Sequence, residues 1–152
     1  MNVEYNGEEK ILTISVAAYN VEEFLANTLN SCVVREVFNE IEVLIVDDGS
    51  TDHTADIAQE YINNYPDMFQ LIRKQNGGYG STVNTSIQLA RGKYIRLLDG
   101  DDWFLSENLP EFILRLKRTD ADMVITPYIE CWGDGEEFIR WPGKMEEDKV
   151  YY

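Results

Sequence analysis

The sequence is poor in the residues that build the commonest protein metal and disulfide sites. It has 2 cysteines and 1 histidine. Cys32 and Cys131 lie far apart and neither belongs to a C-x-x-C pair, so the sequence indicates neither a zinc site nor a disulfide framework. We interpret both cysteines as packing or surface residues, and His53 as an exposed residue near a helix start. This cysteine usage fits a reducing cytoplasm.

Basic residues are scarce as well. The chain has 13 Lys and Arg against 28 Asp and Glu, a formal net charge of -15. Such a charge repels the phosphates of DNA and RNA and an anionic membrane surface, which argues against a nucleic-acid partner. A phosphorylated small ligand would be repelled too, so a divalent cation or backbone N–H groups would have to supply much of its attraction.

Long hydrophobic runs are absent. No stretch approaches the roughly 18 apolar residues of a membrane span, and the N-terminus lacks the pattern of a secretory signal. We therefore expect a cytoplasmic segment, placed at the inner face of a membrane only if a longer parent chain carries an anchor. The 152 residues, 44% apolar and 12% aromatic, favour one globular domain spanning 1–152 over disorder.

Short runs rich in Ile and Val alternate with segments of helical periodicity. This alternation predicts an α/β fold with an open, mostly parallel sheet and helices on both faces. Asn20 with Glu23 resembles a capping box, and GDGEE in the tail predicts a hairpin. The expected strands are 11–19, 41–48, 69–74, 93–99 and 122–128, and helices are expected to start near Asn20, Ser50 or Thr51, Ser81 and Ser106.

Polar clusters follow three of the predicted strands: AAYN, DDGSTD and DGDD. In open α/β sheets ligands bind outside the carboxyl ends of the strands, near the switch in strand order. Ser50, Thr51 and Asp52 are explained as helix caps. Asp47 and Asp48 precede the turn, so one of them is expected to face a cleft.

The DGDD cluster places Asp99, Asp101 and Asp102 within four positions. Like charges this close raise each other's pKa unless a cation or hydrogen bonds offset them. Hard carboxylate oxygens suit Mg²⁺ or Mn²⁺. The spacing excludes a calcium EF-hand loop, whose sixth position would be Phe104 instead of glycine.

Tyr19 and the loop NGGYG allow two interpretations each. Tyr19 either packs at the mouth of the sheet or stacks on a planar base. The glycines permit a sharp turn or a close approach of backbone to a ligand, but they form neither G-x-G-x-x-G nor a P-loop.

Taken together, VAAYN, EVLIVDDGSTD, QNGGYGSTVN and LLDGDD resemble the family 2 glycosyltransferases, which have the GT-A fold. The resemblance runs from Ile11 to Tyr128. It implies transfer of a sugar from a nucleotide diphosphate donor, usually a UDP-sugar, to an acceptor hydroxyl with inversion, using Mg²⁺ or Mn²⁺. Cell-surface polysaccharide or glycolipid assembly is the expected process.

The resemblance also implies roles on the nucleotide side. Tyr19 matches the residue that packs on the base, and Asp48 the carboxylate that accepts the base's N–H. The other matching donor-site positions are Ala17, Glu22, Asn76, Gly78 and Asn84.

On the metal side, Asp99 and Asp101 match the D-x-D pair. Asp101 matches the direct metal ligand, and Asp99 a contact to the ribose or to a metal-bound water. Asp102 and Trp103 would shape the sugar side of the pocket.

The sequence departs from the family pattern at two points. Ala17 and Ala18 replace a segment that often holds proline, and Val83 replaces a common arginine. The second change removes a cation, leaving Arg73, Lys74 or the metal to contact the pyrophosphate.

An inverting transfer also needs a general base. The resemblance places it beyond Tyr152, so we expect a donor-binding part of a longer enzyme that binds without efficient transfer. Glu147 and Asp148 are interpreted as solvated surface. The alternatives are a catalytically incomplete nucleotide- or metal-binding module and a phosphohydrolase of the haloacid dehalogenase type. The order of the acidic clusters along the chain fits neither this phosphohydrolase class nor a receiver domain.

Overall fold

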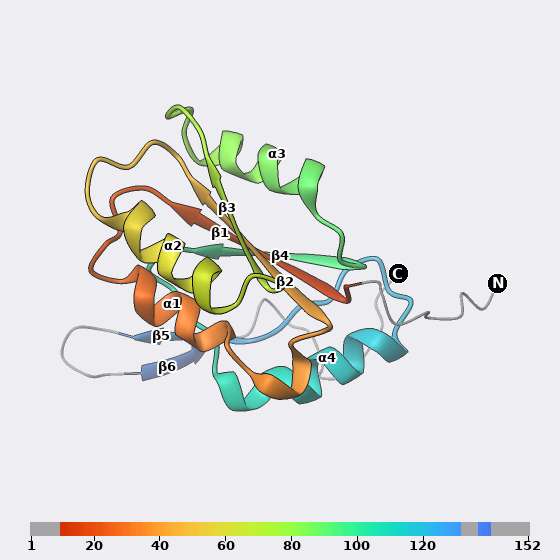
Figure 1. The fold of residues 1–152 in the computed structure, drawn as a ribbon. Helices are drawn as coiled ribbons and strands as arrows, with labels where there is room; N and C mark the ends of the chain where they lie inside the picture. The colour runs from red at the N-terminus through yellow and green to blue at the C-terminus, as the bar shows by residue number, and fades with distance from the viewer. Residues whose placement is uncertain (1–9, 132–136, 141–152) are drawn as a thin grey trace. The chain divides into compact units, whose positions relative to one another are not determined.

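The computed structural model describes residues 10–131 and 137–140 and separates into two compact units, Met1–Arg118 and Thr119–Tyr152. The first unit contains a parallel four-stranded sheet in the order β3-β2-β1-β4 (Figure 1). This confirms the predicted α/β class. The strands are β1 (Leu12–Ala18), β2 (Ile41–Asp47), β3 (Phe69–Arg73) and β4 (Tyr94–Asp99).

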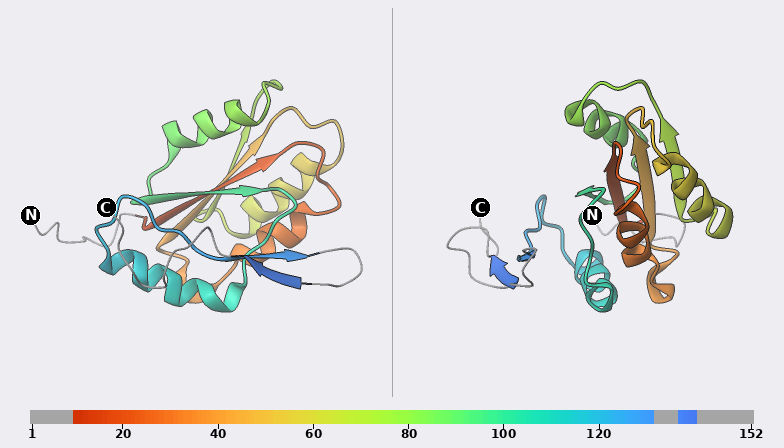
Figure 2. Two further views of the ribbon diagram at one scale, coloured as in Figure 1. Left: turned by 180° about the vertical axis from the view of Figure 1, so that it is seen from behind. Right: turned by 90° about the vertical axis from the view of Figure 1, so that its left-hand side faces the viewer.

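Helices cover both faces of this sheet, as predicted. Figure 2 shows α3 (Tyr79–Leu89) on one face and α1 (Leu25–Cys32) with α2 (Thr54–Asn64) on the other. The 3₁₀ turn η1 (Arg35–Val37) leads into β2. A second 3₁₀ turn, η2 (Ser106–Asn108), opens α4 (Leu109–Arg118).

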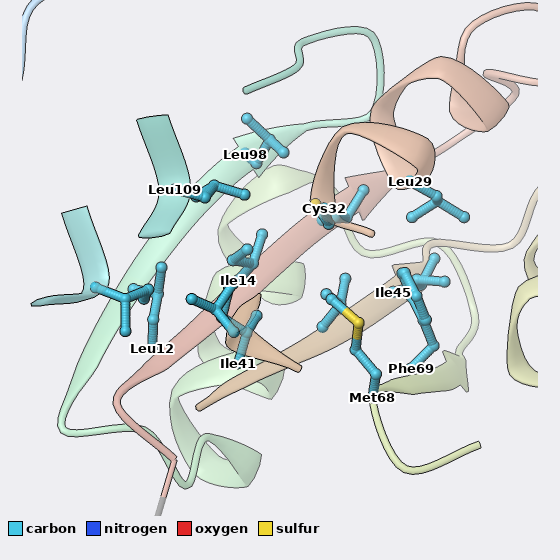
Figure 3. Packing of buried hydrophobic residues seen from close by; sticks show 14 of the residues in the cluster. Leu12, Ile14, Leu29, Cys32, Ile41, Ile45, Met68, Phe69, Leu98 and Leu109 are labelled. Atoms are coloured by element: carbon cyan, nitrogen blue, oxygen red, sulfur yellow. The ribbon is translucent and has the colours of Figure 1, made fainter. Parts of the chain in front are cut away.

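The hydrophobic core lies on the face that carries α1, α2 and α4 (Figure 3). Successive side chains of a strand point to opposite faces, so Leu12, Ile14 and Val16 of β1 all enter this core. Leu29 and Leu109 meet them from α1 and α4. Each buried aliphatic side chain of this size contributes about 1.5–3 kcal/mol.

The face toward α3 includes several small polar residues. Ser15 of β1 and Ser86 of α3 are buried, and their hydroxyl oxygens lie 2.5 Å apart. Thr82 of α3 is buried as well. Small side chains let this helix lie close to the sheet, and their hydroxyl groups form hydrogen bonds.

The predicted fifth strand is wrong for residues 122–127, which form no regular structure. β5 (Tyr128–Cys131) starts after Pro127 and pairs antiparallel with β6 (Glu137–Arg140). Proline has no N–H to donate to a ladder, so it favours the boundary of a strand over its interior. The pairing confirms the predicted hairpin, whose connecting residues lie outside the described part.

Two helices start later than predicted. α1 begins at Leu25 with Phe24 at its N-cap, because Asn20 adopts φ 53° and its side-chain oxygen accepts the N–H of Thr51. α2 begins at Thr54, whose N–H donates to Asp52 at 3.0 Å. Among helices in the described ranges, none combines the length and the apolar character required to cross a bilayer.

Candidate functional site

The strand order places a switch point between β1 and β4. β1 lies between β2 and β4 in the sheet, and crevices at such points are the usual ligand sites of open α/β folds. In the strand register Ala17 pairs with Asp99, and the N–H of Asp48 donates to the carbonyl of Ala18 at 2.9 Å. The ends of β1, β2 and β4, which carry the three polar clusters, therefore meet at one edge.

The loop after β1 is bound to the turn after β2. The N–H of Asn20 donates to Ser50 Oγ at 3.0 Å, and the N–H of Thr51 donates to Asn20 Oδ1 at 2.9 Å. Glu22 Oε2 accepts the N–H of His53 at 2.8 Å. Ser50, Thr51 and Glu22 thus fix the two loops against each other. Tyr19, at the start of the first loop, is 50% exposed.

Neither carboxylate at the end of β2 is open to solvent, contrary to the expectation that one faces a cleft. Asp47 is fully buried and accepts the Ser50 N–H at 2.8 Å and Arg73 Nε at 3.1 Å. Asp48 is nearly buried and accepts the Lys74 ammonium group. Both cations that the sequence offers to a pyrophosphate are therefore paired with these carboxylates.

Asp48 also holds the glycine-rich loop. Its Oδ1 accepts the N–H of Gly77 at 3.0 Å and its Oδ2 that of Gly78 at 2.8 Å. The pKa of Asp48 is lowered, and the largest cause is the hydrogen bond from Lys74. Burial acts to raise this pKa, whereas the two glycine amides and the charge of Lys74 lower it further. Asp48 is thus a carboxylate held ready as an acceptor.

The loop itself leads directly into α3. Gly78 has φ +79°, a conformation that favours glycine, and α3 begins at Tyr79, two residues earlier than predicted. Asn76 is exposed in the loop, and Asn84 is exposed on the second turn of the helix. Both amides are available to a ligand above the loop.

The acidic cluster forms a turn at the end of β4. The N–H of Asp102 donates to the carbonyl of Asp99 at 3.0 Å, and Asp99, Asp101 and Asp102 are all exposed. Although Asp102 is exposed, the part of its carboxyl group that is covered loses hydration, which raises its pKa, and the charges of Asp101 and Asp99 raise the pKa further. Repulsion inside the cluster, expected from the sequence, therefore acts on this residue. Trp103 follows and is 48% exposed.

The carboxylate oxygens of this turn suit a hard divalent cation whose remaining coordination positions are filled by a bound ligand. Within residues 10–131 and 137–140, no three His, Cys, Asp or Glu side chains converge as a metal cage. Mg²⁺ is usually bound by one or two carboxylates together with substrate phosphate oxygens. Asp99 and Asp101 supply donors of that type and number.

Sequence reasoning missed three residues around this turn. The pKa of Tyr79 is raised, first by burial, then by its interactions with Asp99 and by the charge of Asp102, so its hydroxyl faces the acidic turn. Thr28 Oγ1 donates to the Gly100 carbonyl at 2.8 Å, and Ser31 Oγ accepts the Phe104 N–H at 3.1 Å. The sequence features that could have pointed to these residues are an aromatic residue inside the glycine loop and small polar residues on the buried side of a helix.

Residues 13–148 match the sequence pattern of Glycosyl transferase family 2. The chain belongs to this family. Membership in this family excludes the phosphohydrolase alternative. In a phosphohydrolase of that type the D-x-D pair would follow the first strand, whereas here it follows β4. EpsH of Bacillus subtilis (strain 168) is 36% identical over 121 residues, covering 80% of this chain and 34% of EpsH.

Two further comparisons cover the same part of the family 2 glycosyltransferase fold. Chondroitin synthase of Escherichia coli is 37% identical over 113 residues, covering 74% of this chain and 16% of that enzyme. The crystal structure of S. aureus TarS 1-349 in complex with UDP-GlcNAc aligns with a TM-score of 0.60 at 29% identity, covering 72% of this chain and 31% of TarS 1-349. The fold is therefore GT-A, and the chain spans about a third or less of these three proteins.

Proposed function

We propose that this family 2 chain is the donor-binding part of an inverting glycosyltransferase. It binds a nucleotide diphosphate sugar, a UDP-sugar in the first place, through a divalent cation, and the complete enzyme transfers the sugar to an acceptor hydroxyl. The observation that carries this proposal is the position of Asp99 and Asp101 at the switch point between β1 and β4. The similarity to TarS, crystallised with UDP-GlcNAc, supports the choice of donor.

On the nucleotide side, we assign the base to the region between the loop after β1 and the glycine loop. Tyr19 supplies an exposed ring for stacking. Asp48 Oδ2 accepts one described hydrogen bond, from Gly78, and has a second lone pair for a base N–H. The Asp48 side chain is 4% exposed, so the base meets only the edge of the carboxylate that reaches the surface. Ala17, Glu22, Asn76 and Asn84 line the same nucleotide region.

On the diphosphate side, Asp101 would hold Mg²⁺ or Mn²⁺ directly, and Asp99 would contact the ribose or a metal-bound water. The cation, when bound, neutralises the donor's phosphates. That contribution matters in a chain of net charge -15 whose nearest cations, Arg73 and Lys74, are already paired. We assign Asp102 and Trp103 to the part of the pocket that holds the sugar.

The acceptor is a saccharide or a lipid-linked saccharide, and the process is cell-surface polysaccharide or glycolipid assembly on the cytoplasmic side. The similarity to chondroitin synthase, named for a polysaccharide, supports this class. A binding module without transfer activity is the competing function.

Isothermal titration calorimetry of UDP with and without Mn²⁺ tests the donor site. Wild-type protein should bind UDP only when the cation is present, and Asp101→Ala should abolish that binding. Asp67→Ala is the matched control, because it removes one exposed carboxylate before β3, at the opposite end of the sheet. Equal binding with and without the cation would refute the metal assignment.

Sugar transfer by the complete enzyme decides between the two functions. Radiolabelled UDP-GlcNAc and UDP-glucose, offered with saccharide acceptors, should yield a labelled product of inverted anomeric configuration. Donor binding without any product would favour the binding module.

A further inference from the structure

Lys74 connects three parts of the fold that meet at the nucleotide region. Its ammonium group donates to the Asp48 carboxylate at the end of β2, to the Gln75 carbonyl at 2.7 Å, and to Ser81 Oγ in the first turn of α3 at 2.7 Å. An ammonium group has three donors, so these bonds use all of them. The Lys74 side chain is 21% exposed, which limits its exchange with water.

These contacts close a ring of hydrogen bonds. Ser81 Oγ, having accepted from Lys74, donates to the Gly78 carbonyl at 2.9 Å. The N–H of Gly78 donates to Asp48 at 2.8 Å, and Asp48 returns to Lys74. Asp48 thus holds the 75–78 loop to the end of β2 and Ser81 holds it to α3, while Lys74 joins these two side chains.

The packing around the ring is tight at Gly77. A Cβ added at Gly77 would lie 2.7 Å from Ser81 Oγ and 3.1 Å from Lys74 Nζ. The glycine thus allows the loop backbone to approach the ammonium group closely enough for its N–H to reach Asp48 at 3.0 Å.

We propose that Lys74 is a positioning residue of the nucleotide site, which orients the Asp48 carboxylate and the 75–78 loop to receive the base. The inference rests on the proposed function for its ligand, while the ring itself stands on the contacts above. Lys74 acts through Asp48 and stays on it when the nucleotide binds. Its loss should therefore weaken contacts to the base, and do so equally for ligands with and without a diphosphate.

Lys74→Met removes the ammonium group and keeps an apolar stem of similar length. Ser81→Ala breaks the ring at another point and leaves the charge in place. Lys117→Met is the matched control, because it removes one cation that pairs with Glu40, at the amino end of β2. Hydrogen exchange of the Gly77 and Gly78 amides, measured by NMR without ligand, reports on the ring, and titrations with uridine and with UDP plus Mn²⁺ report on the base.

In Lys74→Met the two glycine amides should exchange about tenfold faster, and uridine and UDP should both bind about tenfold more weakly, as expected for loss of a charged hydrogen bond. Ser81→Ala should shift the same quantities in the same direction, and Lys117→Met none of them. If Lys74→Met does not fold, Ser81→Ala carries the test.

Unchanged amide exchange in a folded Lys74→Met or Ser81→Ala protein would overturn the proposal. So would a loss confined to UDP, which would place the ammonium group on the diphosphate. If wild-type protein binds neither uridine nor UDP, the proposed function fails, and the ligand-free exchange still decides whether Lys74 orders the loop.

Discussion

Replacing Glu42 with leucine should destabilise the fold strongly without altering the nucleotide site. Glu42 is almost fully buried on β2, and Thr13 Oγ1 and the backbone N–H of Arg91 both donate to its Oε1 at 2.6 Å. Arg91 Nε donates to Oε2, also at 2.6 Å. These bonds attach the segment after α3 to β1 and β2 at the amino ends of the strands, away from Asp48.

The size of the effect follows from these contacts. A hydrogen bond to a charged group contributes about 1.5–3 kcal/mol, and leucine leaves the Thr13 hydroxyl and the Arg91 N–H without their acceptor. The Arg91 side chain is 66% exposed, so its ion pair adds under about 1 kcal/mol. We expect a loss of about 3–5 kcal/mol for Glu42→Leu, and under about 1 kcal/mol for Arg91→Met.

Urea denaturation followed by circular dichroism measures both variants, and UDP titration of the folded fraction checks the site. A loss below about 1 kcal/mol for Glu42→Leu would refute the reasoning, since it would mean that the buried carboxylate contributes no more than a surface pair. Loss of UDP affinity in the folded variant would show that the amino end of the sheet is coupled to the nucleotide site.

The pH dependence of the same variant has a definite sign. Burial, the largest single influence, acts to raise the Glu42 pKa, but the bonds from Thr13 and Arg91 and the charge of Arg91 outweigh it and lower the pKa. A lowered pKa means that the carboxylate stabilises the fold above its unfolded pKa of about 4.3, and that this stabilisation is lost as pH falls through the folded value. The stability difference between wild type and Glu42→Leu should therefore narrow below about pH 4.

Three further predictions concern single residues. Tyr19→Ala should weaken UDP binding by about 1–2 kcal/mol in calorimetry if the ring stacks on the base, and unchanged affinity would reduce Tyr19 to a packing role. Gly92→Ala should lower the urea midpoint by an amount equivalent to about 1–3 kcal/mol, because the new Cβ would lie 2.5 Å from the Thr13 backbone nitrogen; an unchanged midpoint would contradict that contact. Burial raises the pKa of the Cys32 thiol to about 12, so a thiol reagent at pH 8 should modify exposed Cys131 and spare Cys32 until the protein unfolds; equal rates at both would contradict the burial.

The sequence by itself determined the class of the fold and the position of the acidic clusters. Strands β1 and β2 are short runs that are mostly apolar and rich in Ile and Val, and the helix between them carries Leu25 and Leu29 at helical spacing, so the local pattern alone places these elements. The D-x-D pair follows β4 by direct adjacency in the chain. These features depend on neighbours within a few residues, which is why they can be read without a structure.

Features that depend on distant partners could not be predicted. Asn20 was expected to cap a helix, but its side-chain oxygen instead accepts a hydrogen bond from Thr51, some thirty positions away. The segment 122–127 has strand-like residues and forms no strand, because a strand exists only when another strand pairs with it.

The partners of Asp48 show the same division most clearly. The sequence indicates a carboxylate at the end of a buried strand, and nothing in the spacing joins it to Lys74 or Gly78. Only the tertiary structure brings them together, because β3 lies beside β2 and returns the chain to the same edge of the sheet. Local periodicity therefore specified the strands, whereas the packing of those strands decided which charges neutralise one another.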